Sequence, residues 1–145
     1  MADKETAVML IREAQKAREM AYVPYSHFRV GAALLTEEGR VYTGCNIENA
    51  AYGPSNCAER TAFFKAVSEG ERSFRAIAVV GAGDTDQEKY AAPCGICRQV
   101  MAEFCRPEEF EIIIANMAGE YYTRTLGELL PDGFGPANLA GRPDV

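Results

Sequence analysis

The sequence predicts an α/β fold, a three-layer α/β/α sandwich around a mixed five-stranded sheet. Two observations lead to this prediction: an amphipathic helical pattern precedes a β-hairpin, and strand-like and helix-like segments alternate after it. Because such alternation implies at least one parallel crossover pair, helices should cover the sheet faces. The chain has 145 residues, enough for one domain and too few for two, so residues 1–145 are expected to form a single domain.

The first helix and the hairpin are predicted from periodicity. Apolar residues recur at helical spacing from Glu5 to Ala21, and Pro24 is expected to stop this helix. Arg29 to Thr36 has the composition of a strand, Glu37-Glu38-Gly39 is a turn signal, and Arg40 to Ile47 is the expected returning strand. Small residues in the first strand indicate close packing by a helix or a ligand.

The rest of the chain alternates. We expect a helix from about Cys57 to Val67 with Asn56 as its N-cap, a strand from Phe74 to Gly81, a helix from Cys94 to Cys105, strands at Phe110 to Asn116 and near Tyr121 to Thr123, and a short helix from Thr125 to Leu130. Residues 82–92 are polar and are expected to form a surface loop that borders a pocket. The tail, residues 132–145, is expected to be irregular, with Phe134 either anchoring it or reaching into a pocket.

Composition limits the possible partners. The net charge is −6 at pH 7, which argues against binding to nucleic acid or to an anionic membrane surface and favours a small substrate. No apolar run approaches the roughly 20 residues that span a bilayer, and the charged start does not resemble a signal peptide. The odd number of cysteines, five, suggests reduced thiols and a cytoplasmic location. Two of them, Cys45 and Cys105, are expected to be small buried apolar residues.

Three cysteines and a glutamate form the motif that carries chemistry. They lie in Cys57-Ala58-Glu59 and in Pro93-Cys94-Gly95-Ile96-Cys97. By itself, Cys-x-x-Cys is a redox pair or half of a structural zinc site. Three sulfur ligands leave a fourth coordination position open for water, as a hydrolytic zinc site requires. The combination matches the three-cysteine signature of zinc nucleobase deaminases, in which the glutamate is not a ligand.

A non-catalytic, zinc-stabilised binding module is the rival hypothesis, although such a module has no use for Glu59. Three thiolates also leave a Zn²⁺ site with a net negative charge, which weakens the metal as a Lewis acid. The helix N-termini and the neighbouring Arg60 are the candidates to withdraw that charge. The alternative for Arg60 is an ordinary surface arginine on a helix.

Polar and aromatic residues near the hairpin offer a binding surface. Asn46 and Glu48 are two apart at a strand end and should project to one face, where they either bind a sugar's hydroxyls or serve local turn geometry. Phe28 is either a core residue or a face on which a base stacks. The only histidine, His27, is expected to be a solvated loop residue.

Several stretches share a pattern with one enzyme family. Together they resemble the cytidine deaminases, in the small, zinc-dependent, homotetrameric type. The zinc motifs are common to a wide superfamily of deaminases. The stretch Asn-Ile-Glu-Asn-Ala narrows the resemblance to those members that act on a free nucleoside. The matching stretches are Pro24-Tyr25-Ser26, Phe28 to Leu34, Asn46 to Tyr52, Cys57 to Ala62, Pro93 to Val100, and Leu129-Leu130-Pro131 with Phe134.

The resemblance implies a reaction and a role for each matching residue. It implies hydrolytic deamination of free cytidine and deoxycytidine to uridine and deoxyuridine, with release of ammonia, in pyrimidine salvage. An aminated nucleoside antibiotic or a nucleotide is the alternative substrate. The implied roles are one zinc ion per chain on Cys57, Cys94 and Cys97; proton transfer by Glu59; ribose binding by Asn46 and Glu48; base stacking by Phe28; a bond from the Ala58 N–H to the pyrimidine carbonyl; and completion of a neighbour's pocket by Phe134 and Tyr52 in a homotetramer with shared active sites.

Overall fold

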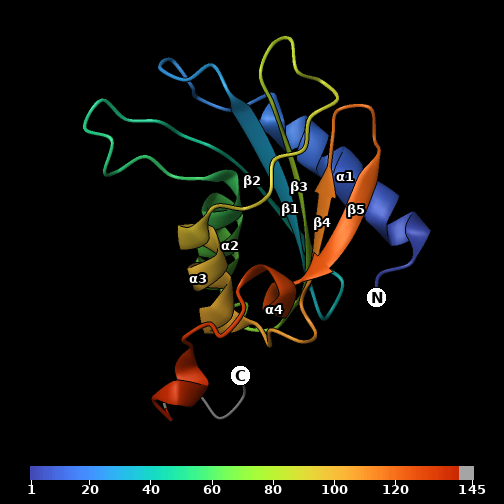
Figure 1. Ribbon diagram of the computed structural model, residues 1–145, viewed down its shortest axis with the longest axis vertical. Coiled ribbons are helices and arrows are strands. Elements are labelled where there is room, and N and C mark those ends of the chain that lie inside the picture. Colours follow the sequence, from blue (N-terminus) through green and yellow to red (C-terminus); the bar gives the residue numbers. More distant parts are fainter. Residues whose placement is uncertain (141–145) are drawn as a thin grey trace.

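The computed structural model describes residues 1–140 and contains the predicted mixed sheet, with strands in the order β2-β1-β3-β4-β5 (Figure 1). Strands β3 and β4 are parallel, and the other neighbours are antiparallel. The hairpin and the parallel crossover predicted from the sequence are therefore confirmed. The strands are β1 (Arg29–Thr36), β2 (Val41–Cys45), β3 (Phe74–Ala82), β4 (Glu111–Ala115) and β5 (Tyr121–Thr125).

Helices cover both faces of the sheet, as the sequence predicts. Figure 1 shows α1 on one side and α2 and α3 on the other. Side chains alternate along β1: Ala33 and Leu35 pack in the cluster that contains α1, and Ala32 and Leu34 pack in the cluster that contains α2 and α3. The helices are α1 (Lys4–Arg18), α2 (Ala58–Ser68), α3 (Gly95–Phe104) and α4 (Leu126–Leu129), followed by a 3₁₀ turn at Pro136–Asn138.

Strand β2 and helix α2 approach each other closely at Gly44. A Cβ atom on Gly44 would lie 2.5 Å from the carbonyl oxygen of Ala58 and 2.6 Å from the nitrogen of Ala62. Because no side chain separates them, the first turn of α2 lies directly against the sheet. The glycine at this position therefore sets how closely the start of α2, with Cys57 and Glu59, approaches the sheet.

Helix α1 ends earlier than the pattern suggests, at Arg18, so the expectation that Pro24 stops it was wrong. The nitrogens of Glu19, Met20 and Ala21 each bond a carbonyl three residues back, which tightens the chain into a turn. The chain then extends, and Tyr22 forms a bridge with Ile47. The alanine at position 21 continued the apolar pattern but belongs to this turn.

The N-cap of α2 is Cys57, and the prediction of Asn56 was wrong. Asn56 instead exchanges two backbone hydrogen bonds with Ile47, each of 2.9 Å. This bridge ties the end of the β2 segment to the start of α2. In the same way α3 begins at Gly95, with Cys94 as its N-cap.

The tail is tied to α3 where the structure describes it. Gln99 donates from Nε2 to the carbonyl oxygen of Phe134 over 2.8 Å. The expectation of an irregular tail missed the 3₁₀ turn, and for residues 141–145 it lies outside the described residues. Within residues 1–140, none of the helices has the length and apolar character needed to cross a bilayer.

Candidate active site

Three cysteine sulfurs meet where helices α2 and α3 begin. Cys57 and Cys94 are the two N-cap residues, and Cys97 is in the first turn of α3. The Sγ of Cys94 lies 3.7 Å from that of Cys57 and 3.4 Å from that of Cys97, and all three lie within 4.8 Å of one another. Tetrahedral zinc with Zn–S bonds of about 2.3 Å separates its sulfur ligands by about 3.8 Å. The donor set therefore fits a zinc ion held by three thiolates.

The electrostatics of the cluster favour a thiolate at Cys57. Interaction with the Cys97 thiol and with the Arg60 guanidinium holds the pKa of Cys57 at about 5, well below its ordinary value. The pKa of Cys97 is raised, because its proton bonds the Cys57 sulfur and because the site is buried. A second thiolate so close to the first needs a cation to stabilise it, which agrees with a metal site.

Arg60 lies beside the sulfurs, not out in solvent. Its Nη2 donates to the Sγ of Cys57 over 3.3 Å. Its Nε is buried and has no hydrogen-bond partner within residues 1–140. The reading of Arg60 as an ordinary surface arginine is therefore wrong, since its charge faces the cysteine cluster.

Glu59 is the second residue of α2 and is only 4% exposed. Burial raises the pKa of its carboxyl group to about 7. A carboxyl group with such a pKa can both accept and release a proton near neutral pH, as a general acid–base catalyst must. Its carboxyl group contacts the side chain of Cys97, one of the three clustered cysteines.

A cavity of about 390 Å³ opens beside the sulfurs, within the size range of small-molecule sites. It brings together predicted residues from four separate parts of the chain. From the loop before β1 comes Phe28, and from the end of β2 come Asn46 and Glu48. The start of α2 contributes Cys57, Ala58, Glu59 and Arg60, and the segment before α3 contributes Cys94.

Phe28 lines this cavity and is 37% exposed, so the alternative of a core position is wrong. Its backbone is held on both sides. The Phe28 nitrogen donates to Oγ of Ser26 over 3.0 Å, and its carbonyl accepts from Nδ2 of Asn46 over 2.8 Å. The ring is thus presented to the cavity by a fixed backbone.

Asn46 and Glu48 organise the cavity wall. Asn46 also accepts from the Val30 nitrogen at 2.9 Å. One oxygen of Glu48 accepts from the nitrogens of Tyr25 and Ser26 at 3.0 and 3.1 Å, and these contacts with Ser26 and Tyr25 lower the pKa of Glu48. Both side chains therefore serve local turn geometry, as one of the two alternatives predicted. Each side chain still has capacity for another hydrogen bond.

Two predicted substrate contacts lie outside this cavity. Tyr52 is 73% exposed, has a positive φ of 61°, and borders an adjacent hollow that shares Ser26, Glu48 and Ser55 with the main cavity. Phe134 is exposed on the tail. The structure thus does not bring either residue into the cavity of its own chain.

The remaining predictions outside the cavity have mixed outcomes. His27 is exposed, as expected. Cys105 is buried in the core, whereas Cys45 is only partly buried. The five cysteines form no disulfide within residues 1–140.

The cavity also contains residues that the sequence reasoning did not assign to it. Ala91 and Ala92 line it, which confirms that the segment 82–92 borders a pocket. Their position directly before Pro93-Cys94 was the available signal. Five further residues line the cavity: Ser26, Val30, Ser55, Asn56 and Val79. For most of them, the only signal in the sequence was that they lie near a predicted site residue.

Comparison with known proteins agrees with this geometry. Residues 4–112 match the family model described as "Cytidine and deoxycytidylate deaminase zinc-binding region". The cytidine deaminase of Sporosarcina psychrophila is 56% identical over 131 residues, which cover 90% of this chain and 93% of that protein. The cytidine deaminase of Halalkalibacterium halodurans is also 56% identical, over 87% of this chain and 92% of that protein.

Solved structures give the same result. The crystal structure of cytidine deaminase from Burkholderia pseudomallei matches with a TM-score of 0.81 and 50% identity, over 92% of this chain and all of that one. The cytidine deaminase of Mycobacterium tuberculosis matches with a TM-score of 0.75 and 40% identity, over 92% and 99% of the two chains. With one zinc site formed by three of its five cysteines, this chain belongs to the cytidine and deoxycytidylate deaminase family, as a small cytidine deaminase.

Proposed function

We propose that the chain hydrolyses free cytidine and deoxycytidine to uridine and deoxyuridine, with release of ammonia, as a step of pyrimidine salvage. The observation that carries the proposal is the position of Glu59. Its buried carboxyl group contacts the Cys97 side chain and lines the cavity of about 390 Å³ beside the cysteine cluster. A purely structural zinc site has no need of such a group.

The chemistry divides between the metal and the chain's own residues. Zinc held by Cys57, Cys94 and Cys97 supplies Lewis acidity that makes water a nucleophile near neutral pH. Glu59 accepts a proton from the attacking water and delivers it to N3 of the cytosine ring. The water oxygen bonds to C4, the second proton passes through Glu59 to the amino group, and the C4–N bond breaks to release ammonia.

The cavity residues supply orientation in this proposal. The ring of Phe28 offers a face for the base. Ala58 is the first residue of α2, so its N–H lacks an intrahelical acceptor and is available to the pyrimidine carbonyl oxygen. Asn46 and Glu48 use their remaining hydrogen-bonding capacity for the ribose hydroxyls.

Charge favours an unphosphorylated substrate. The chain carries a net charge of −6, and the lowered pKa of Glu48, to which hydrogen bonding from Ser26 contributes most, keeps its carboxylate ionised at the cavity wall. A phosphate group on the ribose would meet this negative charge. The family model also covers deoxycytidylate, a nucleotide, so deoxycytidylate is the substrate to compare directly.

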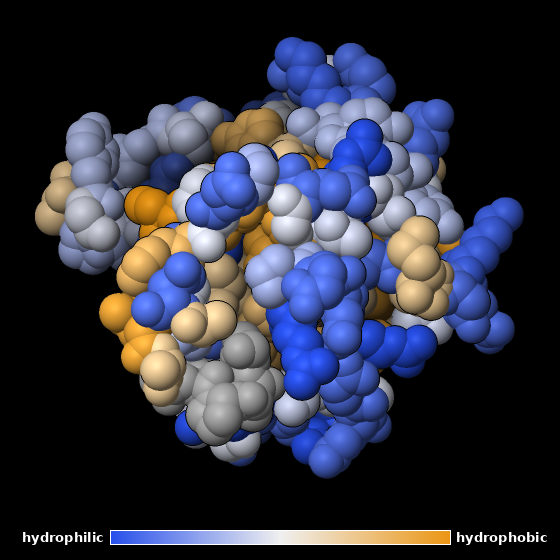
Figure 2. Space-filling view, turned by 60° about the horizontal axis from the view of Figure 1, so that its bottom comes forward, coloured by the Kyte–Doolittle hydropathy of each residue, from blue (hydrophilic) through white to orange (hydrophobic). Residues whose placement is uncertain are grey.

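We also propose that the chain is one domain that works as a homotetramer in the cytoplasm, with Tyr52 and Phe134 completing a neighbour's site. Both are exposed and lie outside their own cavity. Figure 2 shows hydrophobic surface at the end of the molecule that carries α3 and the tail. Exposed apolar surface of this kind is typical of protein interfaces. The absence of disulfides within residues 1–140 is compatible with a reducing compartment.

The decisive experiment combines metal analysis with ultraviolet absorbance. We expect one zinc ion per chain. We also expect the absorbance of the cytosine base to fall when cytidine or deoxycytidine is the substrate, and to fall much more slowly with deoxycytidylate. Zinc without any absorbance change would support a binding module instead. Faster turnover of deoxycytidylate would reject the nucleoside assignment. The mass in solution tests the tetramer.

A further inference from the structure

Arg18 is a buried cation on the face of the sheet opposite the cysteine cluster. It is the last residue of α1 and is 6% exposed. Its only ion pair within residues 1–140 is with Glu19, at 3.7 Å, and the Glu19 side chain is 69% exposed. Such a pair contributes little, while burial of a charge is costly. Packing alone would be served as well by an apolar side chain.

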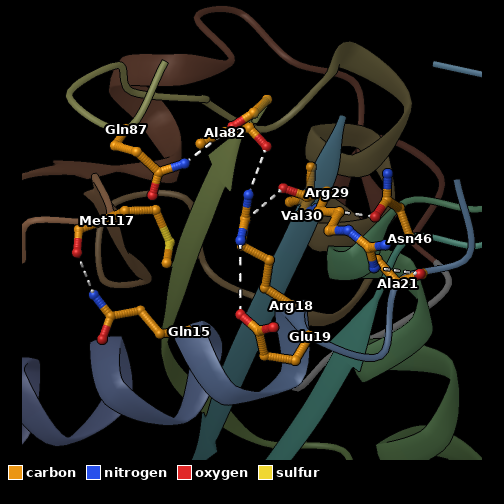
Figure 3. A network of polar contacts seen from close by, with 11 residues as sticks. Gln15, Arg18, Glu19, Ala21, Arg29, Val30, Asn46, Ala82, Gln87 and Met117 are labelled. Carbon is orange, nitrogen blue, oxygen red and sulfur yellow. Dashed lines mark hydrogen bonds and ion pairs between the residues drawn. The ribbon is translucent and has the colours of Figure 1, made fainter. Parts of the chain in front are cut away.

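The guanidinium bonds the ends of two strands. Nε donates to the carbonyl oxygen of Arg29 over 3.1 Å, and Nη2 donates to that of Ala82 over 2.9 Å. Arg29 and Ala82 are paired in the register of β1 and β3. Figure 3 shows the Arg18 side chain reaching from α1 to these two carbonyls. The planar guanidinium of Arg18 therefore joins β1 and β3 at the Arg29–Ala82 pair, at the end of their shared register.

Both strand ends connect to the cavity wall, one directly and the other through residues 83–90. Phe28 precedes Arg29, and the segment after Ala82 continues to Ala91, which lines the cavity with Phe28. The two walls also touch at the adjacent Gly81. A Cβ there would lie 2.7 Å from Cβ of Ala91 and 3.2 Å from Cε1 of Phe28. Movement of either strand end would thus shift the aromatic ring relative to the cavity.

We propose that Arg18 is a positioning residue that sets the ring of Phe28 for binding of the pyrimidine base. This inference rests on the proposed function, because it takes the base as the group that Phe28 faces. Arg18 acts from behind the sheet and through backbone carbonyls. It touches neither the base nor the cysteines.

The test measures kcat and KM for cytidine in Arg18→Met and Arg18→Lys. We expect KM to rise about tenfold in Arg18→Met with zinc content unchanged, since small displacements of positioning groups have effects of tenfold or more. A merely structural role would reduce the folded fraction and lower apparent kcat with KM unchanged, which overturns the proposal. Arg18→Lys keeps the charge but cannot reproduce the fork, and we expect an intermediate KM. It also serves as the second variant if Arg18→Met does not fold.

A double-mutant cycle with Phe28→Leu identifies the route of the effect. If Arg18 acts through the ring, Arg18→Met should change KM less than twofold in the Phe28→Leu background. A full tenfold change in that background would overturn the proposal. Arg72→Met is the matched control, because Arg72 also bonds backbone carbonyls, of Val67 and Glu71, away from the cavity.

Binding of uridine by calorimetry separates this inference from the proposed function. If the wild type turns over cytidine and Arg18→Met has an unchanged KM, the role of Arg18 is rejected and the proposed function stands. A wild type without turnover rejects the proposed function. In that case weaker uridine binding by Arg18→Met still supports positioning, and equal or absent uridine binding in both proteins overturns it.

Discussion

Nη2 of Arg60 lies 3.3 Å from the Sγ of Cys57, one helical turn back along α2. This contact brings a permanent positive charge to a sulfur that the geometry assigns to zinc. The Nε of Arg60 is buried and has no hydrogen-bond partner within the described chain. A guanidinium so placed withdraws electron density from the ligand set and offsets the charge of three thiolates.

Replacement of Arg60 by alanine should therefore weaken the metal centre without unfolding the chain. Loss of a residue that supports a metal ligand typically costs 10–100-fold in metal affinity or activity, and we expect a loss in that range. Zinc content after dialysis and turnover of cytidine measure it. Arg72→Ala, in an exposed arginine outside the site, is the control. Full zinc and normal turnover in Arg60→Ala would reject the role.

Replacement of Glu59 by glutamine should abolish turnover and keep the metal. The amide has nearly the shape of the carboxyl group but cannot shuttle protons, so we expect a loss of at least about 10²–10⁴-fold. The fold should be retained, because a neutral amide tolerates this buried position better than a charge does. Zinc analysis and uridine binding are the controls. Turnover within tenfold of wild type would exclude Glu59 as the proton carrier.

Two replacements of Glu48 separate its structural bonds from its charge. Its Oε1 accepts from the nitrogens of Tyr25 and Ser26, and the oxygen of glutamine can accept both bonds as well. Glu48→Gln should therefore raise KM for cytidine moderately, while Glu48→Ala should raise it further, by about 10-fold or more, as both loop bonds are lost. The same assay with deoxycytidylate should show relatively better binding by Glu48→Gln. Equal KM values for the two variants would contradict the separation.

The sequence was sufficient for the layers of the fold and for the residues of the metal site. Alternation of side chains, as in Ala32 to Leu35, follows directly from strand geometry, and the cysteine spacing is constrained by metal chemistry. Helix starts were less predictable. The N-cap of α2 is Cys57, whose side chain makes no capping bond, while the better capping residue Asn56 forms a bridge with Ile47. Local composition does not show which of the two residues takes the N-cap position.

Contacts between distant segments could not be predicted from the sequence. Phe28 is a residue type common in cores, and only its hydrogen bond to Ser26 and the one it accepts from Asn46 hold it at the cavity. The partners of Arg18 are backbone carbonyls, which leave no side-chain pattern in the sequence from which its position could be predicted.

Removal of zinc should lower thermal stability. The three sulfurs join the starts of α2 and α3, so a metal that binds only the folded chain stabilises it by mass action. Zinc at 100 times its dissociation constant contributes about 2.7 kcal/mol, which is about 5–10 °C in Tm for a chain of this size. Differential scanning fluorimetry with a chelator and with zinc added back measures the shift. An unchanged Tm after verified loss of zinc would show that the site does not support the fold.

Gly44→Ala should affect both stability and the metal centre, because a Cβ would lie 2.5 Å from the Ala58 carbonyl and 2.6 Å from the Ala62 nitrogen. Both of these atoms belong to backbone that cannot rotate away, so α2 must move from β2. Overpacking of this kind costs about 1–3 kcal/mol, and we expect a matching fall in Tm. Since Ala58 follows Cys57 and precedes Glu59, zinc affinity and turnover should fall with it. Gly53→Ala, where the nearest atom would be 4.0 Å away, is the control. A Gly44→Ala variant that loses stability but keeps full zinc affinity and turnover would show that α2 does not transmit the displacement to the sulfurs.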